Sequence, residues 1–226
     1  WRLCKVDKYK IAIVIPAFNE ETTIYDVVQS VEKYGLVIVV NDASIDRTKQ
    51  MAEDAGAIVV SHKENQGYDG ALNSGFLKAE MLNCKAVVTF DADGQHSAEF
   101  IEEYIKELSN GVDLVLGIRP KPARISEKFF MYYSRYRFNW NDPLCGMKGY
   151  SMRLYRKLGY VDSKKSIGTE LAVYGLEHGF SHTQIQITIA QRQDEPRFAS
   201  ICKSNLKIMK ALFELIFKKT CKYDKC

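Results

Sequence analysis

The sequence predicts an α/β fold in which helices cover both faces of a mostly parallel β-sheet. Five short, largely apolar runs recur along the first half of the chain: Lys10–Ile15, Leu36–Val40, Ala57–Val60, Ala86–Phe90 and Asp113–Gly117. Segments with the apolar spacing of amphipathic helices separate these runs. Strands that are apolar throughout and alternate with helices are typical of parallel sheets that are buried on both faces.

The helices between these strands are placed from the same periodicity. We expect them at Glu21–Val31, Thr48–Ala55, Gly70–Leu82 and from Ser97 to about Leu108. The hydroxyl of Ser97 is expected to cap the fourth helix, because serine is a preferred N-terminal cap. The crossovers between parallel strands should be right-handed.

The pattern changes after Arg119, where two prolines interrupt the chain and an aromatic, basic segment follows. Further elements are expected as short helices at Tyr150–Leu158 and Glu170–His178, a strand at Gln184–Ala190 and an amphipathic helix at Ser204–Lys219. A chain of 226 residues suffices for one domain with a complete core. We therefore expect one domain over residues 1–200, followed by a C-terminal amphipathic helix and tail over residues 201–226.

Composition favours a globular protein of a reducing compartment. The chain is 46% hydrophobic and 27% charged, and it holds no apolar run long enough for a membrane-spanning helix. Its six cysteines are scattered and form no Cys-x-x-Cys pair, which favours free thiols and a cytoplasmic location. The net charge of +4 is too small to name a partner by itself.

Polar residues directly follow three of the expected strands, in the segments Pro16–Glu20, Asn41–Ser44 and Asp91–Asp93. The carboxyl ends of parallel strands meet at one edge of a sheet, where ligands bind. Mg²⁺ and Mn²⁺ prefer oxygen ligands and keep waters and substrate phosphates around them, so one or two protein carboxylates suffice. An isolated Asp-x-Asp is common in solvated turns. The shared edge is what favours a metal pair here.

Two neighbouring features leave more than one interpretation open. The glycines of Asn65–Gly75 follow the third strand and match neither a Walker loop nor Gly-x-Gly-x-x-Gly, so a plain strand-to-helix turn is an equal alternative. His96 is a candidate ligand or phosphate contact. The other three histidines (His62, His178, His182) form no spacing pattern and are interpreted as structural.

In their order along the chain, these segments resemble glycosyltransferase family 2, the inverting enzymes of the GT-A fold. The matching segments are Ile15–Glu21, Val39–Thr48, Asn65–Gly75, Phe90–His96, Leu116–Arg119, Asp142–Ser151 and Ile167–Phe180. The resemblance covers about residues 10–197. It implies a nucleotide-binding half at about 10–118 and an acceptor half at about 119–200.

Within that family, the sequence is most similar to dolichyl- or polyprenyl-phosphate sugar transferases. The features that point there are the segment Asp142–Gly146, Gln95 two residues after the second aspartate, and Arg192 with Arg197. The resemblance therefore implies a nucleotide sugar, with UDP or GDP, as the donor. It implies a polyprenyl phosphate as the acceptor and Mg²⁺ or Mn²⁺ as the metal.

The resemblance also assigns roles to individual residues. The residues expected to bind the nucleotide sugar are Pro16, Ala17, Asn19, Glu20, Asp42, Gly70, Asp91, Ala92, Asp93 and Arg192. The metal would be held by Asp91, Asp93 and Gln95. Arg119 would face the diphosphate or an acceptor phosphate, and Asp142 and Glu170 would lie near the acceptor as catalytic residues.

The chemistry leaves the acceptor open between two classes. An acceptor phosphate is already ionised and needs no strong base, whereas a saccharide hydroxyl, as in cell-surface polysaccharide synthesis, needs a carboxylate to take its proton. Asp142 and Glu170 are the candidates for that carboxylate. A nucleotide-sugar-binding module without catalysis is a third alternative. A dinucleotide oxidoreductase is disfavoured because the first strand ends in Pro16 and not in a glycine motif.

Basic and aromatic residues gather between Arg119 and Trp140. No RNP-like or helix-turn-helix signature accompanies them, so nucleic acid is not expected as a partner. A membrane surface or a lipid phosphate fits this composition better, and lysines flank the apolar face of the C-terminal helix. A solvated lysine face on a helix that packs on the core is the alternative. Peripheral contact with the cytoplasmic face of a membrane is therefore a further expectation.

Overall fold

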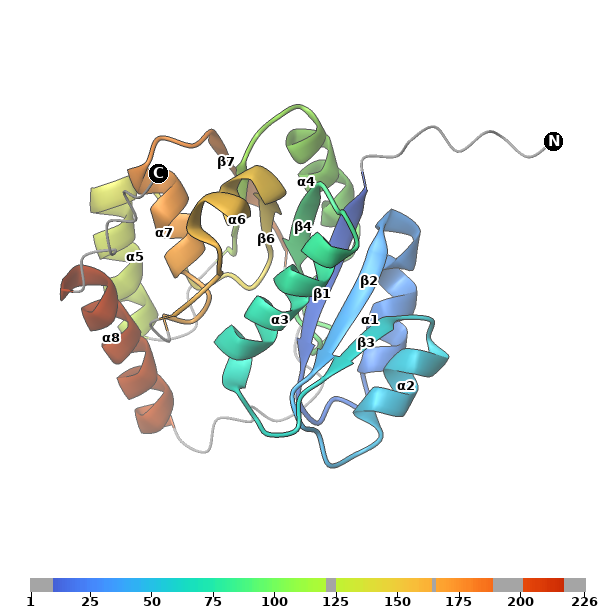
Figure 1. Cartoon of the computed structure of the whole chain (residues 1–226). Coiled ribbons are helices and arrows are strands. Elements are labelled where there is room, and N and C mark those ends of the chain that lie inside the picture. Colours follow the sequence, from blue (N-terminus) through green and yellow to red (C-terminus); the bar gives the residue numbers. More distant parts are fainter. Residues whose placement is uncertain (1–9, 121–124, 164–165, 189–200, 218–226) are drawn as a thin grey trace.

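The fold is built on one seven-stranded mixed sheet with helices packed on both of its faces (Figure 1). The computed structural model describes residues 10–120, 125–163, 166–188 and 201–217. The strands are β1 (Ile11–Ala17), β2 (Leu36–Asn41), β3 (Ile58–Ser61), β4 (Ala86–Thr89), β5 (Leu114–Ile118), β6 (Lys148–Ser151) and β7 (His182–Gln186). Their order across the sheet is β3-β2-β1-β4-β6-β5-β7.

Six of these strands run in one direction, and β6 runs against them between β4 and β5. The register of β6 pairs Lys148 with Thr89 on one side and with Leu116 on the other. The start of β6 therefore lies at the same edge of the sheet as the carboxyl ends of β1, β2, β4 and β5. This edge is called the site edge below.

The helices form two layers because each presents one apolar stripe to the sheet. They are α1 (Ile24–Val31), α2 (Thr48–Asp54), α3 (Gly67–Met81), α4 (Phe100–Ser109), α6 (Met152–Leu158) and α7 (Glu170–Glu177), with a short 3-10 turn η1 at Glu32–Tyr34. Side chains of α1, α2 and α4 fill one buried cluster, and those of α3, α6 and α7 fill the cluster on the other face. In α1, for example, the four apolar residues of the helical repeat are all buried.

Two further helices, α5 (Ile125–Phe138) and α8 (Ile201–Phe217), lie side by side, and α5 contacts α7 (Figure 1). Phe130 of α5 packs with Ile208, Ala211 and Leu212 of α8 in a small separate core. The hydroxyl of Ser126 also donates a 2.6 Å hydrogen bond to Asn205. The C-terminal helix is thus joined to the domain through α5.

The predicted fold class is confirmed, and the differences concern single elements. The helix expected at Tyr150–Leu158 begins only at Met152, because the preceding residues form the antiparallel strand β6. The prediction that Ser97 caps the fourth helix is wrong. Helix α4 begins at Phe100, and the residue at its N-cap position is Glu99, whose side chain makes no capping hydrogen bond. The last strand begins at His182, two residues earlier than expected, and Ala190 lies outside the described residues.

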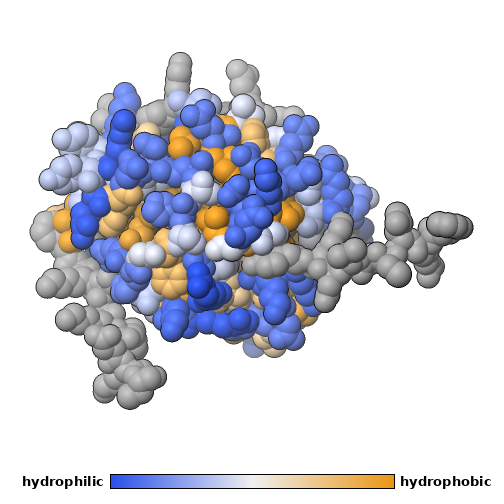
Figure 2. Space-filling view, turned by 90° about the horizontal axis from the view of Figure 1, so that it is seen from above, coloured by the Kyte–Doolittle hydropathy of each residue, from blue (hydrophilic) through white to orange (hydrophobic). Residues whose placement is uncertain are grey.

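The surface of the molecule is mostly polar on the face drawn in Figure 2. Figure 2, seen from above relative to Figure 1, shows a face that is mostly hydrophilic, with hydrophobic residues in small groups between the polar ones. Across the described ranges, the structure contains no helix that is both long and apolar enough to cross a membrane.

Candidate active site

The loops after β1 and β2 are locked together by reciprocal hydrogen bonds. The backbone N–H of Asn19 donates to the Ser44 hydroxyl (3.0 Å), and the N–H of Ile45 donates back to the Asn19 side chain (3.0 Å). The N–H of Glu20 donates to the Thr48 hydroxyl at 2.7 Å. Asn19 holds a left-handed backbone with φ of 55°, a conformation that asparagine tolerates better than most residues. The structure thus brings two of the three predicted polar segments together.

Asp42, expected to contact the base of the nucleotide, is buried at the end of β2 and organises the glycine-rich loop. Its carboxylate accepts hydrogen bonds from the backbone N–H groups of Gln66 and Gly67, both at 2.8 Å. Nδ1 of His62 lies 2.7 Å from the same carboxylate, and Nε2 of His62 lies 2.8 Å from the Ser74 hydroxyl. An anion at the start of α3 is also favoured by the helix dipole. Contact with the base stays a prediction for Asp42.

His62 is a residue whose importance the sequence did not reveal. Because it joins Asp42 to Ser74 in α3, it fixes the direction of the Asp42 carboxylate. The glycine-rich loop is part of the helix itself, since α3 begins at Gly67 and not at Gly70 as expected. Gly70 faces Gln66 one turn earlier, where an added Cβ would lie 2.5 Å from the Gln66 Cβ.

Asp91 follows β4 directly and lies in contact with two elements of the site edge. Its Oδ2 atom is 3.0 Å from Nε2 of His96, and Gly146 packs against the carboxylate so closely that a Cβ there would lie 2.0 Å from Oδ2. Burial would raise the pKa of Asp91, but the contact with His96 and the positive charges of Lys148 and Arg119 together outweigh it and hold the pKa below its usual value. The same contact raises the pKa of His96 against the effect of burial.

The geometry fits a hard cation that brings ligands of its own. The described residues hold no cluster of three His, Cys, Asp or Glu side chains that would coordinate a metal alone. The Asp91 side chain remains 30% exposed, and the hydrogen bond that it makes within the described residues uses Oδ2. Asp93 accepts the backbone N–H of Gln95 at 3.1 Å. Two accessible aspartates suit a Mg²⁺ or Mn²⁺ ion whose remaining ligands come from substrate phosphate and water.

Of the two neighbours of the aspartate pair, His96 contacts Asp91 through its side chain. Gln95 donates a hydrogen bond from its backbone N–H to the Asp93 carboxylate. That the Gln95 side chain is a metal ligand stays a prediction. Ala92 between the aspartates is buried. Arg192, expected at the nucleotide, and Arg197 lie outside the described residues.

Arg119, at the end of β5, forms a two-pronged ion pair with Asp142. Nε lies 2.7 Å from Oδ2 and Nη2 lies 2.8 Å from Oδ1, while the Arg119 backbone N–H donates to Oδ2 at 3.0 Å. Nη2 also lies 3.3 Å from Glu127 of α5. Burial would lower the pKa of the guanidinium, but the two carboxylates outweigh it and raise the pKa. Both oxygens of Asp142 are therefore engaged with a permanent cation.

Glu170, the first residue of α7, is likewise enclosed by hydrogen-bond donors. Its Oε1 accepts from the Tyr160 hydroxyl at 3.2 Å, and its Oε2 accepts from the N–H and the hydroxyl of Ser163 at 2.7 and 2.9 Å. The side chain is fully buried. The structure thus shows Glu170 tying α7 to the loop after α6, and a catalytic role for it stays a prediction.

The structure adds Lys148, a residue that the sequence did not single out. It begins β6 at the site edge and is 4% exposed. The Thr89 hydroxyl accepts its N–H at 3.0 Å and donates to the Gly146 carbonyl at 2.6 Å, which joins the end of β4 to the start of β6. Burial lowers the pKa of the Lys148 ammonium, although the charges of Asp142 and Asp91 act in the opposite direction.

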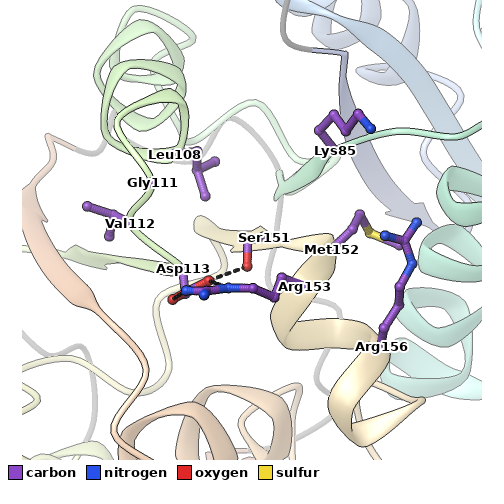
Figure 3. Close-up of a pocket in the computed structure, with 9 residues that line it drawn as sticks. All are labelled: Lys85, Leu108, Gly111, Val112, Asp113, Ser151, Met152, Arg153 and Arg156. Carbon is purple, nitrogen blue, oxygen red and sulfur yellow. Dashed lines mark hydrogen bonds and ion pairs between the residues drawn. The ribbon is translucent and has the colours of Figure 1, made fainter.

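A separate pocket of about 360 Å³ lies among residues at the opposite ends of β4 and β5 (Figure 3). Asp113, Ser151 and Arg153 point toward one another there, and Asp113 accepts hydrogen bonds from both. Burial would raise the pKa of Asp113, but these bonds outweigh it and lower the pKa. None of the predicted site residues lines this pocket, and its one carboxylate, Asp113, is held by Ser151 and Arg153.

Comparison with known proteins gives a consistent result. The sequence profile described as "Glycosyl transferase family 2" matches residues 12–164. An uncharacterised protein of Methanocaldococcus jannaschii is 30% identical over 233 residues, covering 95% of this chain and 94% of that protein. A dolichyl-phosphate hexose transferase of Haloferax volcanii is 24% identical over 217 residues, covering 88% of this chain and 93% of that protein.

A solved structure with the same fold is glucosyl-3-phosphoglycerate synthase from Mycobacterium tuberculosis, in complex with Mn²⁺ and UDP-glucose. It superposes with a TM-score of 0.75 at 21% identity, covering 92% of this chain and 78% of that one. At this level of identity, the likeness concerns the fold.

Proposed function

This chain belongs to glycosyl transferase family 2, and we propose that it transfers a sugar from a nucleoside diphosphate sugar to a polyprenyl phosphate with inversion at the anomeric carbon. The observation that carries the proposal is the meeting of Asp91, Arg119 and the Asp42 loop at one edge of the sheet. Relatives that act on dolichyl phosphate and a fold neighbour that binds UDP-glucose support the two substrates.

On the donor side, the residues of this chain hold and orient the nucleotide. The locked loops of Asn19 and Ser44, with Asp42 behind them, would form the wall of the nucleoside pocket. A divalent cation at Asp91 and Asp93, with Gln95 nearby, would neutralise the charge that develops on the diphosphate as its bond to the sugar breaks. His96 holds Asp91 toward that position, since its Nε2 contacts the carboxylate.

On the acceptor side, Arg119 supplies a permanent positive charge. Its guanidinium is held in place by Asp142 and Glu127, so that it keeps one orientation and does not need to be ordered when substrate binds. We assign Arg119 to the attraction of the acceptor phosphate. Asp142 would then act by positioning Arg119.

The same half of the molecule presents a face suited to a membrane surface. On α5, Phe129, Tyr132 and Tyr136 are 60%, 77% and 85% exposed, and Lys128 and Arg135 are exposed on the same helix. Aromatic side chains with basic neighbours are typical of segments that lie at the headgroup level of anionic bilayers. Glu127, on the buried side of α5, contacts Arg119, so the helix that carries this exposed face also borders the acceptor side of the site. Peripheral membrane contact through α5 is therefore part of the proposal.

The test is a screen of UDP- and GDP-sugars with Mn²⁺ and a short prenyl phosphate in detergent. We expect transfer with one donor, loss of transfer in Asp93→Ala, and normal transfer in the matched control Asp54→Ala, which removes an exposed carboxylate of α2. Full turnover by Asp93→Ala would contradict the metal assignment. Transfer to free saccharides alone would overturn the acceptor, and nucleotide binding without turnover would overturn the enzymatic function.

A further inference from the structure

Lys148 carries a buried positive charge whose hydrogen-bonding capacity is mostly unused among the described residues. Its Nζ atom reaches one hydrogen-bond acceptor among the described residues, the Gly168 carbonyl, and only at 3.5 Å. An ammonium has three donors, and leaving donors unsatisfied in a buried place is costly. A methionine of similar length would fill the same space without that cost. The charge therefore needs a reason other than packing.

A second buried donor lies beside it. Nζ of Lys148 lies over the Trp140 ring, 5.7 Å from its centroid, a cation–π contact that stabilises the ammonium in part but uses none of its hydrogen-bond donors. The indole Nε1 of Trp140, itself fully buried, finds no acceptor in the described part of the chain. Two neighbouring donors, one without an acceptor among the described residues and one with a single acceptor at 3.5 Å, indicate a ligand that presents oxygen atoms carrying negative charge.

The position of Lys148 places this charge at the site. It begins β6 at the site edge, next to Thr89 and two residues after Gly146, which touches Asp91. The charges of Asp142 and Asp91 both act on its pKa, as does that of Arg119. Gly168, whose carbonyl is the acceptor for Lys148 among the described residues, lies two residues before α7, and a Cβ added there would meet Leu72 and Tyr68 of α3.

The other charged groups near the acceptor side are already committed. The Arg119 guanidinium contacts Asp142 and Glu127, and both oxygens of Asp142 accept from Arg119. Both oxygens of Glu170 accept hydrogen bonds from the loop after α6. A hydroxyl acceptor would need an available carboxylate, and an ionised acceptor needs an available cation. Lys148 supplies that cation and adds its charge to that of Arg119, whose guanidinium is shared with two carboxylates.

We infer that Lys148 binds the ionised phosphate of the acceptor and holds its attacking oxygen at the donor sugar. This inference rests on the proposed function and deepens it. A phosphate oxygen forms the new bond to the anomeric carbon, and the bond from that carbon to the diphosphate breaks. The electron pair of the broken bond leaves with the nucleoside diphosphate. No proton has to move, because the attacking oxygen is already ionised.

The experiment compares Lys148→Met with Lys148→Arg, which keeps the charge, and with Lys85→Met, which removes an exposed lysine just before β4 at the other edge of the sheet. Titration calorimetry measures the binding of farnesyl phosphate, of farnesol, and of UDP with Mn²⁺. Steady-state assays measure KM for donor and acceptor separately. Thermal unfolding reports whether each variant is folded.

For Lys148→Met we expect farnesyl phosphate to bind about 10- to 100-fold more weakly, the effect of losing one charged hydrogen bond. Binding of farnesol and UDP should not change, and the variant should unfold at the same or a higher temperature. Lys148→Arg should recover part of the affinity, and Lys85→Met should match the unmodified protein.

The outcomes separate the two proposals. If the unmodified protein uses farnesyl phosphate and Lys148→Met binds it equally well, the inference is wrong and the proposed function stands. A loss of UDP affinity in Lys148→Met would assign the lysine to the donor and overturn the inference as well. If the unmodified protein neither binds nor uses prenyl phosphates, the proposed acceptor fails together with the inference.

Discussion

Gly146→Ala is the substitution that tests the position of Asp91 without removing any functional group. The added Cβ would lie 2.0 Å from Oδ2 and 2.4 Å from Cγ of Asp91, and these are its nearest neighbours. Ordinary contacts of a Cβ begin near 3.4 Å, so the carboxylate would have to move by more than an ångström. Gly146 does not have a left-handed backbone, so alanine fits the chain there. The strain therefore falls on the Asp91 side chain.

The expected effect on catalysis follows from this displacement. A misplacement of about 1 Å in a reacting group costs on the order of 100-fold in rate, which corresponds to about 2.7 kcal/mol of transition-state stabilisation. We expect kcat/KM for the donor to fall by that factor. The concentration of Mn²⁺ needed for half-maximal activity should rise. The melting temperature should change little, because Asp91 can rotate toward solvent.

The matched control is Gly175→Ala in α7, where the nearest atom to an added Cβ is the flexible end of Leu154 at 3.1 Å. Steady-state kinetics over a Mn²⁺ series and thermal unfolding measure both variants. The control should keep normal kinetics. Gly146→Ala with unchanged kcat/KM and metal dependence would refute the role of Asp91 in placing donor and metal.

Three further predictions concern the stability of the fold, the binding of UDP and the need for a metal ion. Asp113→Asn should lower the free energy of unfolding by about 1.5–3 kcal/mol at neutral pH, through weaker bonds to Arg153. Folding lowers the pKa of Asp113 below the value of 3.8 that is usual for an aspartate. The difference in free energy of unfolding between the two proteins should therefore be fully present above pH 3.8 and shrink as the pH falls below it. Urea unfolding at a series of pH values measures this difference. His62→Ala should weaken the binding of UDP about tenfold in calorimetry, because Asp42 loses the partner that orients it; unchanged affinity would contradict that role. EDTA should abolish transfer, and added Mn²⁺ or Mg²⁺ should restore it; activity that survives chelation would count against the metal.

The parallel part of the sheet could be predicted because its sequence signal is local. Each strand from β1 to β5 is a short apolar run with a helical repeat beside it, and in a parallel sheet such runs end at a common edge. From the sequence alone, that rule predicts that the segments at Asn19, Asp42 and Asp91 lie at one edge of the sheet. It needed no knowledge of which strands are neighbours.

The hydrogen-bond partners inside the site could not be predicted in the same way. Arg119 and Asp142 are 23 residues apart, and Asp42 meets His62 from a distance of 20 residues. Nothing in the pattern of either segment specifies these pairs, because each depends on how two loops approach in space. The sequence therefore indicated Asp142 as a charged residue near the acceptor but gave no sign that Arg119 occupies both of its oxygens.

Lys148 could not be predicted as a site residue because it begins the antiparallel strand β6, which the sequence pattern does not indicate. The apolar residues from Tyr150 to Leu158 continue the helical repeat of α6, so the last two residues of β6 read as the start of a helix, and Lys148 and Gly149 belong to no predicted element. The rule that ligands bind at the carboxyl ends of strands also fails for this strand, since a reversed strand brings its first residue to the site edge. The first residue of an antiparallel strand should therefore be considered as a possible ligand-binding residue in the same way as the last residues of the parallel strands beside it. For this chain the rule selects Lys148, the one residue of β6 that carries a charge.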